Sequence, residues 1–534
     1  MRLRSVAKPL AYLLGCLLYG VSDWLTDEFG SVTVDQVLYH LSFGASGLLN
    51  SDPELFWRFV RRALVLPMGM GLGLWGVDAF IGYSRVHGVS ATWARIGAAL
   101  GAAWNGLGRA GHLAVALGHR VFHRRLPWLV ALAGAIYFID SFSLVSYVRQ
   151  YFGPDYFSGS YVAPRLATSK GKEKPRNLVL IYVESLENTY SDPNLFGHDL
   201  LARLNALKDR GAVSFEDYQQ MPGAHFTIAG IVSSQCGMPL KSLAMFSGNE
   251  QGEKVARFLP RATCLGDILA RQGYSNTFLN GSSLEFAGVG KFLSDHHYKK
   301  VVGREEWIGL GEKQETMSGW GLYDDDLFRR ARGELAMLMK AGKPFNLTLL
   351  TIDTHHPYGQ LSTRCRRDGY SDFEGIVECT ANQVAEFIEH IEKNGWMDKV
   401  AVVVQGDHLA MGNTAYDKLT SNPHRTVFNL LMTGHRKLTK NTEQVTHFDM
   451  LPTILELMGF TVEGERAGLG YTALGPATAP RPADRLATMN AQLMNYSQAY
   501  RDLWDQPQPP AEVAAPTEPS PAPAPLSTRT SALN

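Results

Sequence analysis

The sequence predicts a two-part protein: an α-helical membrane region, followed by an α/β domain with a mostly parallel central sheet. Apolar segments are concentrated in the first 150 of the 534 residues. From residue 176, near-continuous apolar runs alternate with helix-like segments, as expected for strands that are buried on both faces. Several of these runs end in acidic residues or histidines, which is typical of sites at the carboxyl ends of parallel strands.

Charge is balanced overall but unevenly distributed. The 51 basic and 51 acidic residues cancel, so the sequence gives no indication of a nucleic-acid partner. No Asp or Glu occurs between Asp78 and Asp140. The arginines of this interval are Arg85, Arg95, Arg109, Arg120, Arg124 and Arg125. Such an asymmetry is the kind that sets membrane topology.

Three apolar segments have about the length of a membrane span: residues 9–25, 63–83 and 126–148. An uncleaved first span is favoured over a signal peptide, because no small-residue cleavage site is evident and further apolar segments follow. Residues 92–118 could form a fourth span. The positive-inside rule instead favours a cytoplasmic or interfacial helix there, with the chain outside from residue 150. Asp78 and Asp140 could pair with another helix or lie near an interface.

The predicted domain boundaries follow changes in composition. They are a transmembrane domain at 1–150, a linker at 151–175, a catalytic domain at 176–480, a C-terminal helix at 481–505 and a disordered Pro/Ala-rich tail at 506–534. Strands are expected at 176–184, 212–217, 275–280, 345–353, 400–406 and 426–433. The exported part contains four of the five cysteines, which suggests two disulfides, with buried thiols as the alternative.

The predicted strand ends carry the residues that could perform chemistry. Glu184 follows one strand, and Asp407 and His408 follow another. Two carboxylates and an imidazole suit Mn²⁺, Mg²⁺ or Zn²⁺, although each residue alone would be an ordinary cap or turn residue. His355 and His356 end a third strand and could bind phosphate or act as a general acid; a structural turn before a proline is the alternative.

Seven motifs, in this order, resemble the phosphoglycerol transferases of type I, which decorate osmoregulated periplasmic glucans. They are YVESLENTY, QQMPGAHFTIAGIVSSQCGMPL, LEFAG, WGLYDD, TIDTHHP, GDHLAM and HFDMLPTILELMG. More distant relatives are lipoteichoic acid synthase, the lipid A phosphoethanolamine transferases and arylsulfatases. The resemblance covers most of residues 176–472 and implies a sulfatase/alkaline-phosphatase-like fold.

The resemblance also implies roles for individual residues. Glu184, Asp407 and His408 match the ligands of one divalent metal ion, with Mn²⁺ favoured. His355 matches a histidine that contacts the phosphoglyceryl group and protonates the leaving group. The implied disulfide pairs are Cys236–Cys264 and Cys365–Cys379. The candidate substrate-binding residues are Asn280, Ser282, Lys291, Trp320, Asp324 and His356. For Trp320 and Asp324, a packed aromatic and a helix cap are equally good explanations.

Position 224 departs from the family pattern. The family is expected to place a threonine nucleophile there, but the chain has Ala224, whose methyl group cannot attack phosphorus. We favour an engineered Thr→Ala change over a natural pseudoenzyme. Thr227 is a possible substitute nucleophile, nearly one helical turn away.

The resulting expectation is a phosphoglycerol transferase that moves glycerol phosphate from phosphatidylglycerol to periplasmic glucan through a covalent threonine intermediate, inactivated here by Ala224. The expected location is a bacterial inner membrane, with the catalytic domain in the periplasm. The expected partners are the donor lipid, the glucan acceptor and the membrane. Two alternatives remain: a phosphoethanolamine transferase of the same superfamily, and a non-catalytic protein that binds lipid or glucan.

Overall fold

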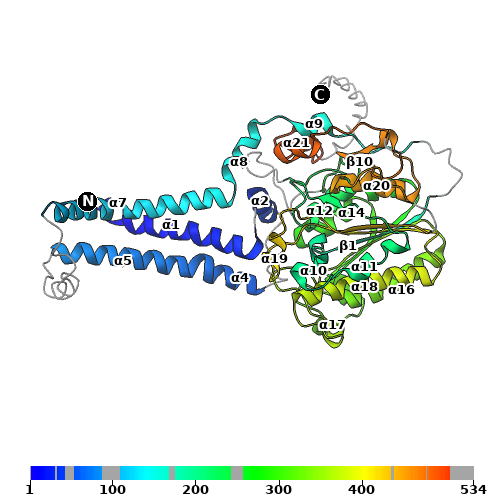
Figure 1. The fold of residues 1–534 in the computed structure, drawn as a ribbon, viewed down its shortest axis with the longest axis horizontal. Coiled ribbons are helices and arrows are strands. Elements are labelled where there is room, and N and C mark those ends of the chain that lie inside the picture. Colours follow the sequence, from blue (N-terminus) through cyan, green and yellow to red (C-terminus); the bar gives the residue numbers. More distant parts are fainter. Residues whose placement is uncertain are drawn as a thin grey trace, which may run out of the picture.

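The computed structural model describes residues 2–30, 33–42, 53–86, 109–167, 175–241, 257–434, 438–476 and 478–505. Three long helices project from one side of an α/β domain (Figure 1). They are α1 (Arg2–Phe29), α5 (Leu66–Val86) and α7 (Arg109–Ser141). α1 lies against both of the others, and α5 continues directly from α4 (Pro53–Phe59) and the π-helical turn η1 (Val60–Val65).

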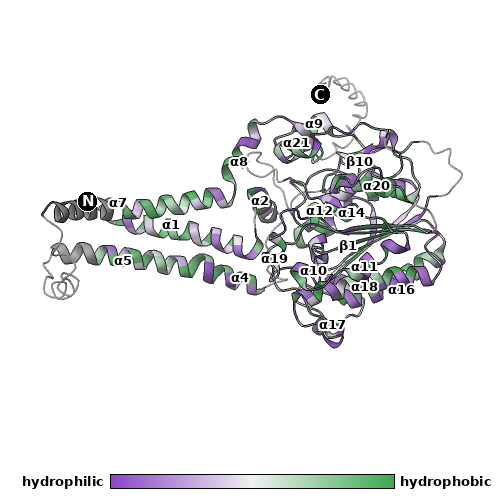
Figure 2. Cartoon of the chain, viewed as in Figure 1, coloured by the Kyte–Doolittle hydropathy of each residue, from purple (hydrophilic) through white to green (hydrophobic). Residues whose placement is uncertain are grey.

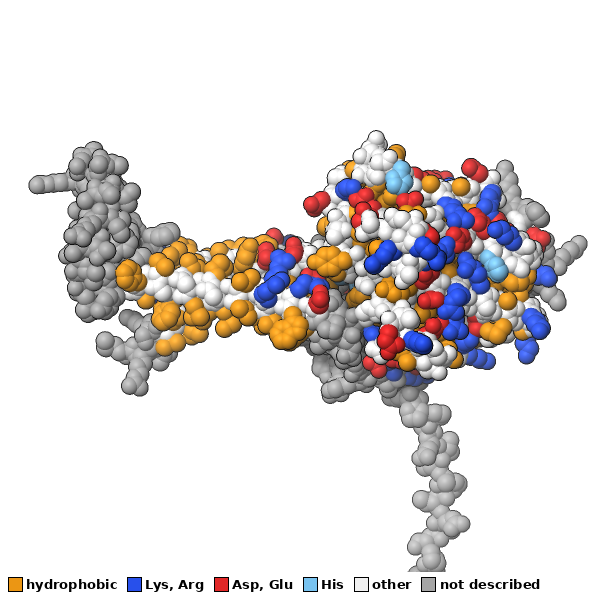
Figure 3. All heavy atoms as spheres, turned by 90° about the horizontal axis from the view of Figure 1, so that it is seen from below, with side chains coloured by type: hydrophobic (Ala, Val, Ile, Leu, Met, Phe, Trp, Pro, Cys, Tyr) orange, Lys and Arg blue, Asp and Glu red, His pale blue; other side chains and the backbone are white. Residues whose placement is uncertain are grey.

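The surface of this helical region is apolar along most of its length (Figures 2 and 3). Leu10, Val77 and Ile136 are examples of exposed apolar side chains on the three helices. Asp78 is buried and forms a 3.1 Å ion pair with Lys8, so this carboxylate does pair with another helix. Charged residues gather at the end nearest the domain, where Arg58 bonds Glu28 at 2.6 Å.

One described helical stretch, Glu54–Phe80, is long and apolar enough to cross a membrane. A second candidate is Arg125–Ser141 together with Leu144–Phe152, which meet at a bend of 59°. The expected spans 63–83 and 126–148 overlap these two stretches, and 9–25 lies within α1. Most of the segment 92–118 lies outside the described residues. Three spans therefore stay a prediction.

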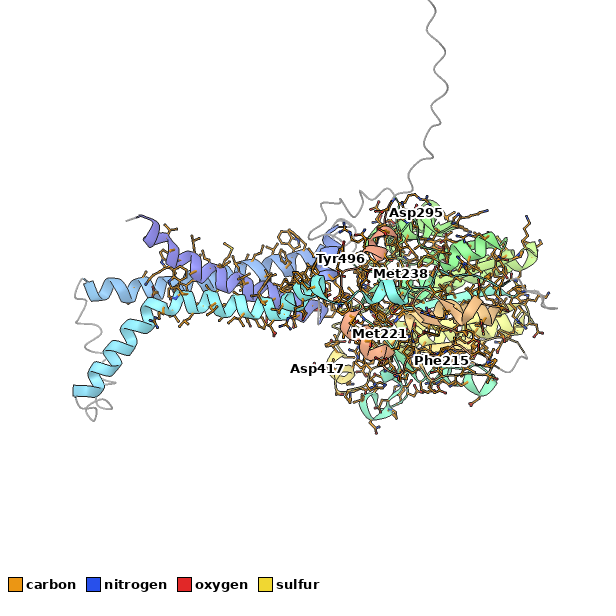
Figure 4. All side chains as sticks on the ribbon, turned by 90° about the horizontal axis from the view of Figure 1, so that it is seen from above. Phe215, Met221, Met238, Asp295, Asp417 and Tyr496 are labelled. Atoms are coloured by element: carbon orange, nitrogen blue, oxygen red, sulfur yellow. A yellow bond between two sulfur atoms is a disulfide. The ribbon has the colours of Figure 1, made fainter. Side chains whose placement is uncertain are left out.

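Short elements connect the long helices to the domain. They are α2 (Val34–Ser42), α8 (Leu144–Arg149), η2 (Gln150–Phe152) and α9 (Tyr156–Ser160). The expected linker packs on the domain where it is described, because Val162 and Leu166 form β-bridges to Gly468 and Val462. Tyr496 and Asp417, labelled in Figure 4, lie on the side of the domain that faces the helices.

The central sheet has six strands in the order β4-β3-β5-β1-β6-β7. Their bounds are β1 Asn177–Val183, β3 Ser275–Asn280, β4 Tyr298–Val302, β5 Phe345–Leu350, β6 Val400–Gly406 and β7 Asn429–Met432. Only β7 is antiparallel to its neighbour, so the predicted mostly parallel sheet is confirmed. β4 was not predicted from the sequence, because this edge strand includes exposed lysines.

Alternate residues of the strands face two hydrophobic clusters. Leu180 of β1 packs with α12 (Thr227–Cys236) and α20 (His447–Met458) on one face. Ile181 packs with α16 (Asp324–Ala341) and α18 (Phe373–Lys393) on the other. This two-sided burial explains why the strand sequences are apolar throughout.

Shorter elements complete the domain. The helices are α10 (Pro193–Phe196), α11 (Ala202–Asn205), α13 (Leu265–Arg271), α14 (Val289–Asp295), α15 (Arg304–Gly309), α17 (Thr363–Arg367), α19 (Tyr416–Thr420), α21 (Arg485–Gln492) and α22 (Gln498–Asp502). The 3₁₀ turns are η3 (Asn188–Ser191), η4 (Lys208–Arg210), η5 (Phe286–Gly288), η6 (Gln314–Thr316) and η7 (Glu463–Glu465). Two small sheets pair β2 (Asp217–Gln219) with β8 (Gln444–Thr446), and β9 (Arg466–Ala467) with β10 (Gly470–Tyr471).

Two sequence expectations differ in detail from these elements. The strand expected at 212–217 is displaced to β2, which belongs to a separate small sheet. Residues 481–505 form two short helices in place of one, because Ser497 caps the second helix by accepting from the Tyr500 N–H. The tail at 506–534 lies outside the described residues.

Both implied disulfides are present, Cys236–Cys264 and Cys365–Cys379. The first joins residues that are 28 apart in sequence and ties the C-terminal end of α12 to the start of α13. The second joins α17 to α18 across 14 residues. Cys16 is the only free cysteine among the described residues.

Replacing Cys236 and Cys264 with alanine is expected to lower the free energy of unfolding by roughly 3–4 kcal/mol, because the bond limits the unfolded chain. Chemical denaturation of the oxidised protein in detergent measures this loss. Cys16→Ala, which removes a buried cysteine but no crosslink, is the control. Equal stabilities for the oxidised protein and the double variant would contradict the expectation.

Candidate metal centre and active site

The three central strands bring the predicted site residues together. β5, β1 and β6 are neighbours in the sheet and run parallel, so their carboxyl ends meet at one edge. Glu184 follows β1, and Asp407 and His408 follow β6. One potential ligand atom from each of these three residues lies within 4.8 Å of the others, and all three side chains are buried.

Asp407 has one oxygen committed to the fold and one available to a cation. Its Oδ1 accepts hydrogen bonds from the Ser185 N–H at 2.8 Å and the His408 N–H at 2.9 Å. Its buried Oδ2 has no hydrogen-bond partner in the structure. An unpaired buried carboxylate oxygen is costly, and a bound cation is the usual compensation.

The hydrogen bonds of His408 fix its tautomer. Nδ1 lies 2.8 Å from the carbonyl oxygen of Leu409 and must donate to it, so the neutral ring carries its lone pair on Nε2. Nε2 lies 3.4 Å from Glu184 Oε1 and 3.5 Å from Asp407 Oδ2. Two carboxylates and this imidazole therefore fit a divalent cation such as Mn²⁺ or Zn²⁺.

Electrostatics show that the site requires positive charge. Burial and the charge of Glu184 raise the pKa of Asp407 to about 8. Burial opposes protonation of His408, but Asp407 and Glu184 together raise its pKa to about 9. Burial also opposes ionisation of Glu184, yet His408 holds the pKa of Glu184 well below its usual range. Without a metal, protons therefore compensate the two carboxylates.

Backbone contacts hold Glu184 in place. Its N–H donates to the Thr351 hydroxyl at 3.0 Å, and its carbonyl accepts from the Thr354 hydroxyl at 2.6 Å. Both threonines belong to the segment that follows β5, so they join the two strand ends. Neither threonine was predicted from the sequence, although both lie in the TIDTHHP motif, which was a usable signal.

Helix α12 points its N-terminus at this centre. Phe226, the residue before the helix, is extended, and Gly223 has a φ of +81°, so the chain turns sharply into α12. A side chain at Gly230 would collide with the carbonyl of Asp407, so glycine allows the helix to approach the metal ligands. The partial positive charge of a helix N-terminus favours a bound anion there.

Thr227, the first residue of α12, has its hydroxyl at the centre. Its Oγ1 donates to Glu184 Oε2 at 3.3 Å, and the residue is partly exposed. Ala224 differs in both respects. It is 0% exposed and sits in a tight turn in which its N–H donates to the Met221 carbonyl.

The tandem histidines are held by ring stacking. His355 packs against Trp320 with ring centroids 3.8 Å apart and the rings tilted by 37°, and it stacks on His356 at 4.5 Å. The Nδ1 of His355 donates to the carbonyl of His356 at 2.8 Å, which leaves the Nε2 lone pair in the neutral ring. His355 directly follows Thr354, whose hydroxyl bonds the Glu184 carbonyl at 2.6 Å, so the histidines belong to the strand end that adjoins the centre.

The other candidate residues have structural partners. Asn280 Nδ2 donates to the Ser282 hydroxyl at 2.8 Å, and the two residues close a turn. Lys291 lies 4.0 Å from Asp295 on its own helix. Asp324 accepts from the Ile352 N–H at 2.8 Å and the Thr380 hydroxyl at 3.0 Å. Asp324 thus supports the strand end that carries the histidines, and burial raises its pKa to about 7.

A second cluster of metal-ligating residue types is Cys264, Asp267 and His296. Cys264 is in a disulfide and cannot act as a thiolate ligand. Asp267 is already bonded to His296 at 2.8 Å and to the exposed His297 at 2.7 Å. This cluster therefore serves the fold.

Residues 176–460 match the Sulfatase family. Phosphoglycerol transferase I from Citrobacter koseri is 39% identical over 306 residues, covering 56% of this chain and 39% of that protein. Phosphoglycerol transferase I from Escherichia coli is 38% identical over 330 residues, covering 60% and 41%. The chain thus spans about two fifths of the length of these relatives. A crystal structure of an alkaline phosphatase superfamily protein from Vibrio parahaemolyticus is 19% identical with a TM-score of 0.46, covering 68% of this chain and 96% of that one.

Mn²⁺ at about 100 times its Kd is expected to stabilise the folded protein by about 2.7 kcal/mol, because the cation binds only the assembled centre. Thermal unfolding with and without Mn²⁺ measures the effect. Asp407→Asn should lose most of the increase in Tm. Asp267→Asn removes a buried carboxylate from the second cluster and should keep it. A similar loss in both variants would count against this centre.

Metal affinity is expected to rise with pH. The raised pKa values of Asp407 and His408 mean that protons occupy these groups at neutral pH and must leave when the metal binds. Each displaced proton makes the affinity increase about tenfold per pH unit below the pKa. Calorimetric titration with Mn²⁺ between about pH 6 and pH 9, in buffers of different ionisation enthalpy, measures affinity and proton release. A pH-independent affinity would refute this.

Proposed function

This chain belongs to the Sulfatase family, and from that premise we propose that it is a metal-dependent phosphotransferase that moves glycerol phosphate from phosphatidylglycerol to a glucan hydroxyl. One observation carries the proposal: a threonine hydroxyl at a helix N-terminus faces two carboxylates and a histidine of the metal-binding type. The similarity to phosphoglycerol transferase I supports the choice of transferred group.

We assign the nucleophile to Thr227, which revises the expectation that Ala224 occupies that position. A nucleophile must reach both the centre and the substrate. The hydroxyl of Thr227 lies 3.3 Å from Glu184 and is partly exposed, whereas Ala224 is fully buried. On this assignment the chain carries its nucleophile, and Ala224 needs no engineered origin.

Glu184, Asp407 and His408 would hold the cation, with Mn²⁺ favoured and Mg²⁺ or Zn²⁺ as alternatives. A divalent cation there supplies Lewis-acid stabilisation of the charge that develops on the phosphoryl oxygens. The N–H groups at the start of α12 face the same region and add to that stabilisation.

The chemistry proceeds in two displacements. In the first, Thr227 Oγ1 loses its proton and bonds to phosphorus, while the bond from phosphorus to the diacylglycerol oxygen breaks. Nε2 of His355 is the candidate to accept the Thr227 proton and then to donate it to that oxygen, because His355 follows Thr354, whose hydroxyl bonds the Glu184 carbonyl at 2.6 Å. In the second, an acceptor hydroxyl gives its proton to His355 Nε2 and attacks phosphorus, the bond from phosphorus to Thr227 Oγ1 breaks, and Oγ1 takes that proton back.

The proposed setting is a bacterial inner membrane, with the catalytic domain in the periplasm. The donor is a membrane lipid, and the long apolar helices suit an anchor in the same bilayer. Two disulfides in the catalytic domain fit an oxidising compartment such as the periplasm.

Thr227→Ala is expected to lower kcat at least about 10³-fold, because the attacking oxygen is removed. Thr227→Ser keeps that oxygen and should stay within about tenfold of wild type. The assay is release of diacylglycerol from phosphatidylglycerol vesicles with Mn²⁺. Mass spectrometry of the unmutated protein should find the phosphoglyceryl adduct on the peptide that contains Thr227.

Ala224→Thr provides the opposite test. The added atoms enter a fully buried turn and should destabilise the protein by about 1–3 kcal/mol without raising kcat. A large gain in activity would restore position 224 as the nucleophile. If only phosphatidylethanolamine were turned over, the donor would be that lipid and not phosphatidylglycerol. If the metal-loaded protein turned over neither lipid, a non-catalytic binder would be favoured.

A further inference from the structure

The helical region touches the active site directly. Phe29, the last residue of α1, lies edge-on against His356 with ring centroids 5.4 Å apart. The next residue, Gly30, has a φ of +76° and packs against the loop that follows Asp407 and His408. A side chain at Gly412 in that loop would meet the Gly30 N–H at 3.2 Å. The end of α1 therefore packs against two segments that carry site residues.

Tyr39 of α2 makes a second connection. The residue is 2% exposed, and its hydroxyl donates to the carbonyl of Ala287 at 2.9 Å. Its ring lies 5.2 Å from that of Phe226, the residue before the nucleophile helix α12. One tyrosine from the helical region thus contacts two separate segments of the catalytic domain.

The hydrogen bond to Ala287 stabilises a strained backbone. Ala287 has a φ of +52°, a left-handed conformation that is unfavourable for a non-glycine residue. The neighbouring Phe286 lies edge-on to Trp320 at 5.4 Å, and Trp320 packs against His355. A continuous line of contacts therefore runs from Tyr39 to His355.

We propose that Tyr39 and Phe29 are positioning residues, through which the membrane-proximal helices hold the histidines and the nucleophile in their reactive arrangement. This inference rests on the proposed phosphotransferase function. The helices would then complete the active site in addition to anchoring it. An anchor alone would need no buried hydrogen bond to Ala287 and no ring contact with His356.

Kinetics on the 534-residue chain in detergent, with Mn²⁺ and the water-soluble diester glycerophospho-p-nitrophenol, separate positioning from anchoring. This substrate requires no membrane, so anchoring alone has no influence on its turnover. Tyr39→Phe and Phe29→Ala should each lower kcat roughly tenfold while KM changes less than about twofold, because small misplacements of reacting groups mainly affect the chemical step.

Tyr274→Phe is the matched control. It also deletes a hydroxyl that donates to a backbone carbonyl, that of Arg176 at 2.8 Å, but it lies at the opposite end of β3 from the site. Its kcat should stay within about twofold of wild type. Equal kcat values for Tyr39→Phe and Tyr274→Phe, with matched melting temperatures, would overturn the proposal.

A measurement that does not depend on turnover tests the positioning role even if the proposed function is wrong. Diethyl pyrocarbonate modifies accessible histidines, and peptide mass spectrometry locates the product. Modification of His355 and His356, both nearly buried, should increase severalfold in Phe29→Ala and Tyr39→Phe but not in Tyr274→Phe. If modification increases in this way but the wild-type protein is inactive, the proposed transferase function is wrong and the positioning role stands. Unchanged modification would overturn the positioning role whatever the activity.

Discussion

The approach of two buried carboxylates at neighbouring strand ends is the constraint on which the rest of the structure depends. Glu184 and Asp407 carry like charges in a region from which water is excluded, so the fold needs a compensating positive charge between them. His408 supplies part of that charge, and a metal ion would supply the remainder. The N-terminus of α12 adds a fixed dipole to the same place.

Much of the fold could be predicted because the hydrophobic pattern of the sequence identifies the buried strands, and the residues that follow each strand identify the site. Strands such as AVVVQ are apolar throughout because both faces are buried, and their ends carry Glu184 and Asp407. The exposed edge strand β4 carries no such signal and was missed. The three ligand candidates could be grouped from sequence because parallel neighbouring strands end together.

What the sequence could not provide was the direction of individual side chains. In the segment PGAHFT, only the backbone turn decides whether position 224 or Thr227 faces Glu184, and a motif comparison favoured the former. Asn280 and Ser282 were selected for their place in a motif, yet their polar atoms bond one another. The contacts of Phe29 with His356 and of Tyr39 with Ala287 join segments more than 200 residues apart, which no local pattern indicates.

The length of α1 has a consequence for which molecules the proposed active site could reach. Its 28 residues extend roughly 42 Å, compared with about 40–45 Å for a bilayer including its headgroups. In the proposed orientation this helix spans the bilayer, and its domain-side end contacts His356 through Phe29. The reacting phosphorus would then lie at the height of the headgroups, so the donor could react while its acyl chains remain in the leaflet, and the water-soluble acceptor would be the molecule that travels.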